Sequence, residues 1–158
     1  MKNVSCCFTG HRDISPAKVP EIKEKLNTVI SQLTQEGYTD FYNGGAIGFD
    51  MLAAEAVLEM KKMHPHIRLH IIVPCENQSQ RWSQDNIDRY NVIITLADEV
   101  KVLSPFYFNG CMQVRNRYMV DNSSVCIAYL ERTTGGSAGT AKYAEGKGLT
   151  VINIADKL

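Results

Sequence analysis

The sequence predicts an α/β protein, a doubly wound Rossmann-like three-layer sandwich in which helices cover both faces of a mainly parallel sheet. Three observations predict this class. Strand-like and helix-like segments alternate along the whole chain. The length of 158 residues suits a single domain with one hydrophobic core, and we assign residues 1–158 to it. The segments that follow the strands are rich in glycine and polar residues, whereas the turns at the other ends are short.

The first half of the chain predicts three strands and two helices. In order, they are a strand at 4–9, a helix at 22–33, a strand at 40–43, a helix at 50–62 and a strand at 67–73. The strands are short runs rich in β-branched and aromatic residues. Apolar residues recur at offsets of 4, 7, 8 and 11 from Ile22, which is the spacing of one helical face. Gly37 ends this first helix, and the second is rich in Ala, Leu, Met and Glu.

The second half predicts three more pairs of helix and strand. In order, they are a helix to about residue 96, a strand at 99–103, a helix at 113–122, a strand at 125–130, a helix at 139–147 and a strand at 149–154. Ser83 is the expected N-cap of the first of these helices. Right-handed crossovers then favour the strand order 3-2-1-4-5-6, with the first strand between the second and the fourth. The ligand crevice of such a sheet lies at the carboxyl edge, between strands 1 and 4.

Composition limits the classes of partner. Formal net charge is zero, with 17 Lys+Arg against 17 Asp+Glu, so we do not expect a nucleic-acid partner or an anionic membrane surface. The apolar runs are too short to span a bilayer, and no leader segment is evident, so we expect a cytoplasmic protein. The five cysteines show no Cys-x-x-Cys spacing, and the histidines and carboxylates form no metal-ligand pattern. No metal site is expected.

Two glycine-rich segments follow strands and lead into helices. The first contributes Gly44, Gly45, Ala46, Gly48 and Asp50, and the second contributes Gly135, Gly136, Ser137, Gly139 and Thr140. Glycine permits close backbone approach, and a helix N-terminus offers free N–H groups and partial positive charge. Phosphate is the expected guest of such segments. The alternative is that both are tight turns in which glycine serves only the geometry.

Further candidates flank these segments. Thr9, Gly10, His11 and Arg12 follow the first strand, where His11 could contact an anion, transfer protons or make a structural hydrogen bond. Arg115 and Arg117 diverge by about 200° on a helix, so at most one points straight into the crevice. Arg115 and its neighbour Asn116 are the expected ligand contacts, and a solvated helix face is the alternative. Trp82 could stack on a base or anchor its loop.

The motifs together resemble one known group. They are FTGHR, NGGAIGFD, the set Pro74, Gln78 and Trp82, RNRYMVD, and GGSAGTAKYA. This combination is similar to YpsA-type members of the SLOG superfamily, a Rossmann-like group that includes the DNA-processing protein DprA and the LOG phosphoribohydrolases. The resemblance covers essentially the whole chain. It implies a nucleotide-derived ligand held by Gly10, Gly44, Gly45, Gly48, Asp50, Arg115, Gly135, Gly136 and Thr140.

One motif departs from the phosphoribohydrolases. In those enzymes, the segment after the fifth strand resembles Pro-Gly-Gly-x-Gly-Thr-x-x-Glu, and its glutamate works in glycosidic cleavage. Here the proline is missing, one residue is inserted, and Tyr143 stands where the glutamate is expected. Glu145 lies two positions further, roughly half a turn around a helix.

The sequence therefore leads to three functional hypotheses. The first is a protein that binds or senses a nucleotide, an ADP-ribose derivative or an NAD-like metabolite, which would be its only bound cofactor. The second is a LOG-type hydrolase of a nucleotide N-glycosidic bond, with His11, Asp50 or Glu145 as acid or base. The third is a DprA-like single-strand binder, which the neutral charge disfavours. A homodimer through the apolar helix at 51–60 is also expected.

Overall fold

The computed structural model describes residues 2–157 and shows a six-stranded parallel sheet with five α-helices. The strands are β1 (Ser5–Gly10), β2 (Asp40–Asn43), β3 (Arg68–Val73), β4 (Glu99–Val102), β5 (Val125–Tyr129) and β6 (Thr150–Asn153). The helices are α1 (Val19–Gln35), α2 (Phe49–Lys61), α3 (Gln84–Leu96), α4 (Cys111–Asp121) and α5 (Gly136–Gly146). The predicted fold class, an α/β Rossmann-like sandwich, is confirmed.

The strand order is 4-3-2-1-5-6, so the predicted order 3-2-1-4-5-6 is wrong in the position of one strand. β4 lies at the edge beside β3, and β1 lies between β2 and β5. A central parallel strand is covered on both faces and needs a continuous apolar run. β5 has such a run and is buried throughout, whereas β4 alternates charged residues with valines and is exposed throughout. The order therefore reverses between β1 and β5, which moves the expected crevice there.

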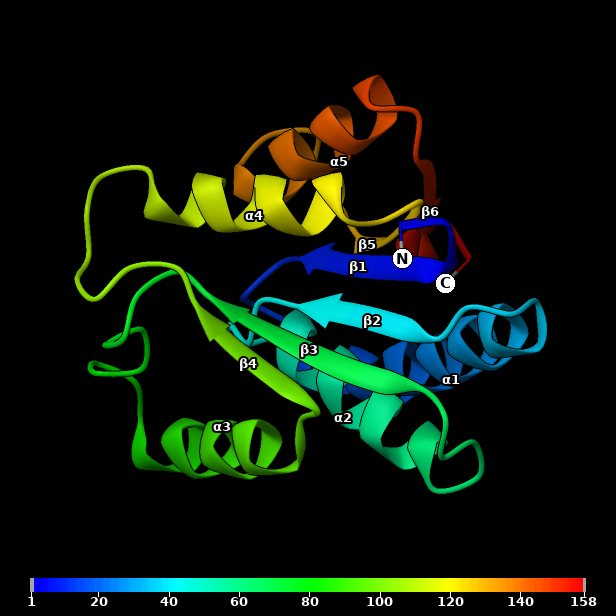
Figure 1. Cartoon of the computed structure of the whole chain (residues 1–158), viewed down its shortest axis with the longest axis horizontal. Coiled ribbons are helices and arrows are strands. Elements are labelled where there is room, and N and C mark those ends of the chain that lie inside the picture. The colour runs from blue at the N-terminus through cyan, green and yellow to red at the C-terminus, as the bar shows by residue number, and fades with distance from the viewer. Residues whose placement is uncertain (1, 158) are drawn as a thin grey trace.

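Helices cover both faces of the sheet (Figure 1). The crossovers that build β2, β3 and β4 place α1, α2 and α3 on one face, and α4 and α5 lie on the other. The larger core lies under α1 and α2, where Phe8 on β1 stacks on Phe41 of β2 with ring centroids 6.2 Å apart. The smaller core lies under α4 and α5 and includes Cys7 and Cys126. Both faces of β1 are thereby buried.

Local signals set the helix ends. The Ser83 hydroxyl accepts a 3.3 Å hydrogen bond from the Asn86 N–H, which confirms the predicted N-cap of α3. Gly37 follows α1 with a φ of 100°, as expected of a C′ glycine. The fifth helix differs from the prediction because it begins at Gly136 rather than 139. The second glycine segment is therefore the first turn of α5 itself.

The surface of α2 and the environment of the cysteines bear on further expectations from the sequence. The apolar side chains of α2, including Met51 and Val57, are buried in the protein's own core, so this helix offers no apolar face to a second copy. All five cysteines are free and buried. Within residues 2–157, no helix is long and apolar enough to cross a membrane, and no group of three or more His, Cys, Asp or Glu could hold a metal ion.

Candidate functional site

A pocket of about 200 Å³ opens at the carboxyl edge of the sheet, where β1, β2 and β5 end. We call it the central pocket. It is lined by Phe8, Thr9, Gly10, Arg12, Ala46, Asp50, Gln78, Trp82, Met112, Arg115, Asn116, Gly136 and Ser137. Nine of these were predicted as ligand contacts, and Gln78 and Trp82 belong to the quoted motifs. Phe8, although it belongs to the FTGHR motif, and Met112 are not among the predicted contacts, because apolar residues of this kind are more often part of the core.

Asp50 and Arg115 meet above Gly44. A Cβ on Gly44 would lie 2.5 Å from Nη1 of Arg115 and 2.8 Å from Oδ2 of Asp50. Glycine is therefore required here so that the carboxylate and the guanidinium can share the floor of the pocket. Asn43 fixes the same turn, since its Oδ1 accepts from the Gly45 N–H and its Nδ2 donates to the Asp50 carbonyl, both at 2.8 Å.

Burial controls the protonation of Asp50. Removal of its carboxyl from water raises the pKa to about 6 from an ordinary 3.8. The positive charge of Arg115, a 3.3 Å hydrogen bond from the Ala46 N–H and the charge of Arg12 all act in the opposite direction. The side chain is therefore mostly ionised at neutral pH and can accept hydrogen bonds from a ligand.

Arg115 is held in place by the protein. Its Nη1 donates to the Gly44 carbonyl at 2.7 Å and to Oε1 of Gln78 at 3.4 Å. Its Nε donates to Oδ1 of Asn116 at 2.8 Å. Arg117, by contrast, lies over the Tyr143 ring, 5.7 Å from its centroid. Of the two arginines, Arg115 lines the central pocket and Arg117 does not.

The candidate glycines of the site differ in what surrounds them. A Cβ on Gly10 would overlap the Phe49 ring, and one on Gly48 would overlap the Arg12 carbonyl. A Cβ on Gly45 would lie 3.0 Å from Tyr90. These three glycines therefore allow α2 and its loop to pack against the protein. At Gly135, Gly136 and Gly139, nothing in the described chain beyond the adjacent residues and the backbone of the helix itself lies within 4 Å of such a Cβ, so their backbone is open to a ligand.

A second hollow, the α5 hollow, lies between α4 and the first turn of α5. Its volume is about 370 Å³, and its lining consists of Gln113, Asn116, Arg117, Gly135, Gly136, Gly139, Thr140 and Tyr143. It shares Asn116 and Gly136 with the central pocket. Thr140 donates to the Gly136 carbonyl and Ser137 donates to the Gly10 carbonyl, so neither side chain caps α5. The first N–H groups of α5 therefore face the hollow without an intrahelical partner.

A third hollow, the Trp82 hollow, adjoins the central pocket and shares Arg12, Gln78, Trp82 and Met112 with it. It has a volume of about 540 Å³ and is lined by Arg12, Cys75, Asn77, Gln78, Gln80, Arg81, Trp82, Tyr107 and Met112. Trp82 packs edge-on against Tyr90, with ring centroids 5.3 Å apart, and also lines the central pocket. Of the two roles considered for Trp82, the anchoring contact is observed, and one surface of the ring remains available at the pocket.

His11 lies behind the pocket and connects two loops. Its buried ring accepts a 2.8 Å hydrogen bond at Nε2 from the Glu131 N–H, and Nδ1 lies 3.3 Å from Nη2 of Arg132. Burial and the Arg132 charge lower the pKa of His11, which favours the neutral ring. The structural hydrogen bond is therefore the role that the geometry shows. Like Gly44, Gly45 and Gly48, His11 lines none of the three hollows.

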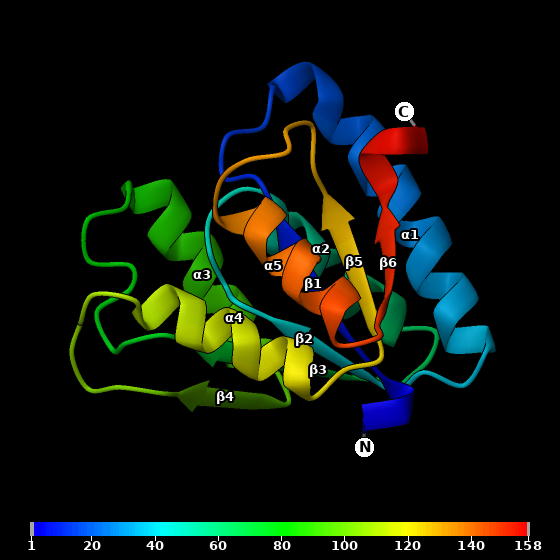
Figure 2. The ribbon, with the colours of Figure 1, turned by 90° about the horizontal axis from the view of Figure 1, so that it is seen from above.

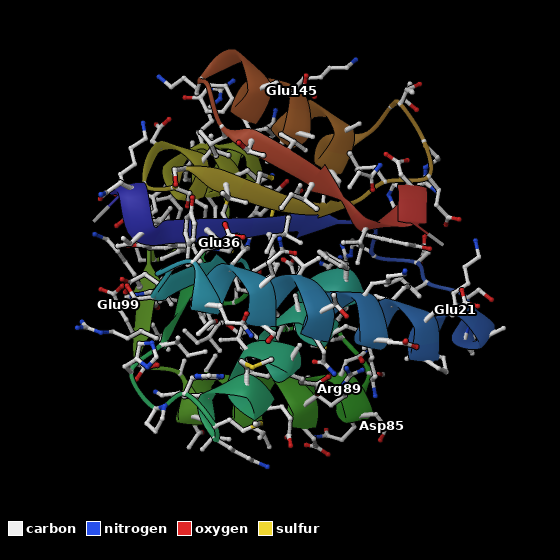
Figure 3. The ribbon with its side chains drawn as sticks, turned by 90° about the vertical axis from the view of Figure 1, so that its right-hand side faces the viewer. Glu21, Glu36, Asp85, Arg89, Glu99 and Glu145 are labelled. Atoms are coloured by element: carbon white, nitrogen blue, oxygen red, sulfur yellow. The ribbon has the colours of Figure 1, made fainter. Side chains whose placement is uncertain are left out.

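Glu145 does not reach the site. It is exposed near the C-terminal end of α5, on the outside of the molecule (Figure 3), whereas the pocket lies at the N-terminal end of that helix. Tyr143, at the position where the hydrolases carry glutamate, donates its hydroxyl to Oδ1 of Asp121 at 2.8 Å. Asp50 is thus the one catalytic candidate of the sequence analysis that lines the pocket.

Comparison with known proteins assigns the chain to a family. The sequence model of the YspA SLOG family matches residues 6–148. The chain belongs to the YpsA-type SLOG family. This YpsA-type chain is 34% identical over 138 residues to the SPbeta prophage-derived protein YoqJ of Bacillus subtilis, covering 79% of the chain and 81% of YoqJ. It is 30% identical over 129 residues to a UPF0398 protein of Brevibacillus brevis, covering 80% of the chain and 69% of that protein.

Solved structures share the fold of this YpsA-type protein. DNA processing protein A of Helicobacter pylori, which was studied for its single-stranded DNA binding, aligns with a TM-score of 0.64 at 20% identity. DprA of Streptococcus pneumoniae aligns with a TM-score of 0.67 at 18% identity. The alignments cover 94% and 93% of the YpsA-type chain but only 63% and 48% of the two DprA chains. At these identities the likeness shows a common fold.

Proposed function

We propose that this YpsA-type protein binds a nucleotide-derived small molecule, with phosphate at the first turn of α5 and the nucleoside in the central pocket. The observation that carries the proposal is the open backbone of Gly135, Gly136 and Gly139 at a helix N-terminus, beside the buried pair Asp50 and Arg115. Free N–H groups and the helix dipole favour a phosphate. The open glycines let that phosphate approach the backbone closely.

The sizes of the hollows support a ligand in two parts. Sites for small molecules usually measure about 300–1,000 Å³, so the central pocket of about 200 Å³ is too small for a whole nucleotide. The adjoining α5 hollow adds about 370 Å³ and shares Asn116 and Gly136 with it. A nucleoside in the pocket and a phosphate in the α5 hollow use both spaces.

The lining of the central pocket suits a nucleoside. Phe8, Trp82 and Met112 provide apolar contacts for a ring. The ionised Asp50 carboxylate accepts hydrogen bonds from sugar hydroxyls or from a ring N–H, and Gln78 presents an amide. Such a mixture of apolar walls and a few fixed polar groups is typical of small-molecule sites.

The same geometry favours binding over hydrolysis. Glycosidic cleavage usually relies on two carboxyl groups beside the scissile bond. Asp50 is the only carboxylate among the thirteen residues of the central pocket, and Glu145 lies at the far end of α5. We therefore propose that AMP, NAD and ADP-ribose bind without release of base.

Isothermal titration calorimetry with AMP, ADP-ribose and NAD tests the proposal. Gly136→Ala adds a methyl group to the open backbone at the N-terminus of α5, and we expect affinity to fall at least about tenfold while the fold persists. Gly146→Ala is the matched control, since it adds the same group to open space at the other end of α5. Absence of binding by all three compounds, or equal affinity of both variants, would contradict the proposal. Chromatography of the incubated mixtures detects released base, which would restore the hydrolase hypothesis.

A second candidate function rests on the DprA likeness. The Trp82 hollow combines Arg12 and Arg81 with the aromatic rings of Trp82 and Tyr107, which is a composition suited to stacked bases of a single strand. The balanced net charge disfavours this function, because single-strand binding depends on many phosphate contacts. Fluorescence anisotropy with a labelled oligonucleotide in low and physiological salt separates the two functions.

A further inference from the structure

The edge strand β4 is the most open element of the sheet. All four of its residues are exposed, and it is bonded to β3 on one side only. Figure 2 shows β4 along the outer margin of the molecule, with no other element outside it. An edge strand with free backbone groups is a template for pairing with another strand.

The phase of the backbone identifies the residues that would make this pairing. The Leu103 N–H donates to the Val73 carbonyl at 2.9 Å, across the junction with β3. Backbone groups of successive residues point to opposite sides of a strand, so residues 99 and 101 also face β3. The N–H and C=O groups of Val100 and Val102 therefore point to the free side.

An exposed apolar patch adjoins this free side. In the register of the sheet, Val100 lies beside Ile71 and Val102 beside Val73, whose side chains belong to the core under α2 and α3. The two valines therefore lie on the α3 side of the sheet, 42% and 43% exposed. Val92 and Leu96 are exposed on α3, one helical turn apart. Exposed apolar side chains that gather on one side of a protein mark interaction sites.

We propose that β4 pairs antiparallel with β4 of a second copy of this chain, on a two-fold axis at Val100. Val100 then forms the hydrogen-bonded pair with its own equivalent, as its free N–H and C=O groups require. Glu99 lies opposite Lys101 of the second copy, and Lys101 lies opposite Glu99. These are non-hydrogen-bonded pairs, in which opposing side chains approach most closely.

The charges of Glu99 and Lys101 favour the register at Val100 over the alternative register at Lys101. A two-fold axis at Lys101 would place two lysines opposite each other, which is destabilising. A lysine on an edge strand normally discourages pairing. Within its own chain, Glu99 contacts Nδ1 of His70 at 2.7 Å through Oε1, and Lys101 lies over the Tyr118 ring. Of the two registers, only the one at Val100 also brings Glu99 opposite Lys101 of the second copy. The resulting sheet is continuous through both copies. This interface is independent of the proposed ligand, whose pocket lies among β1, α4 and α5.

The interface is small, so we expect a weak dimer. A four-residue strand and a short apolar patch belong at the low end of specific interfaces, which suggests a dissociation constant on the order of 10–100 µM. Sedimentation equilibrium of the full chain from about 1 to 500 µM covers this range.

Charge-swapped variants make the test specific. Lys101→Glu leaves only glutamates at positions 99 and 101, and Glu99→Lys leaves only lysines, so we expect each variant to be monomeric across the range. An equimolar mixture of the two restores both ion pairs and should form a heterodimer. Lys142→Glu, an exposed position on α5, is the control for net charge and should associate like the wild type.

Three outcomes would overturn the proposal. They are a wild type that stays monomeric at the highest concentration, a Lys101→Glu variant that associates as tightly as the wild type, and a mixture that forms no heterodimer. Circular dichroism confirms that each variant is folded. Unfolded variants could not associate with each other, so a heterodimer in the mixture cannot result from a general loss of structure.

Discussion

Asp50 is a residue that lowers the stability of its own protein. A carboxyl whose pKa is raised by burial is held against its preference for water, and this arrangement is concentrated at functional sites. Nearby, Arg115 and the Ala46 N–H compensate only in part. The proposed ligand would complete the hydrogen bonds of this carboxylate.

This arrangement predicts a stability that depends on pH. Because folding raises the pKa of Asp50, its contribution to stability is fully present below about pH 3.8 and is lost as the pH rises through about 6. A shift of this size corresponds to about 3 kcal/mol at pH 7.5. Asp50→Asn cannot ionise, so we expect it to be more stable than the wild type at pH 7.5 and equally stable near pH 4.

Urea unfolding at several pH values measures this difference. Asp13→Asn, which changes an exposed carboxyl, is the matched control and should show no such trend. A difference between wild type and Asp50→Asn that stays constant from pH 4 to 8 would show that Asp50 is not buried as an acid. Calorimetry on the same variant should show weaker ligand binding, because the anionic acceptor is lost.

The sequence predicted most of the residues that line the central pocket, but not the pairing of Asp50 with Arg115. The glycine segments and Arg115 stand out by composition and spacing. That Asp50 and Arg115 meet above Gly44 depends on how α4 crosses the sheet, because the two residues lie on different elements. The role of His11 depends on its hydrogen bond to the Glu131 N–H, 120 residues away in the chain.

At the scale of elements, the N-terminus of α2 packs tightly against the end of β1. Gly48 caps α2 with a φ of 87°, and the Phe49 N–H donates to the His11 carbonyl at 3.1 Å. Gly10 gives the Phe49 ring its space. These contacts position the N-terminus of α2, and hence Asp50, against the end of β1.

Two glycines with similar φ values separate the effects of strain and of packing. Gly37 has a φ of 100° and open surroundings within the described chain, so Gly37→Ala should cost about 1–2 kcal/mol from backbone strain. Gly48→Ala adds a collision with the Arg12 carbonyl, which raises the expected cost by about 1–3 kcal/mol more. Chemical denaturation of both variants gives the comparison. Equal losses would show that the α2 junction relaxes freely.

At the scale of the whole molecule, the alternation of strands and helices predicted the fold class, and the strand order was the error. Composition contains the signal that corrects it. The Glu-Val-Lys-Val sequence of β4 alternates, as an edge strand does, whereas the Val-Cys-Ile-Ala-Tyr sequence of β5 is continuously apolar. The strand order 3-2-1-4-5-6 would place β4 inside the sheet, where its two charged residues would be buried.

Hydrogen exchange tests the observed order. At about 1 µM, below the expected dissociation constant of the dimer, the amides of β4 should exchange faster than those of the inner strands, because β4 is an edge strand and all four of its residues are exposed. Amides of β1 and β5 should exchange slowest, since both strands are buried between neighbours. Slow exchange in β4 at this concentration would support the order with β4 at the centre.

The position of β1 also has a consequence for synthesis. β1 is the first of the six strands to leave the ribosome. Its neighbour β5 does not follow until about 120 residues later, which corresponds to roughly 6–24 s of translation. During this interval, β2 can pair with one side of β1, but the other side has no strand to join. A nascent chain therefore exposes an unpaired edge of a strand that is almost fully buried in the folded protein, and a chaperone that binds extended apolar segments is the natural protection for it.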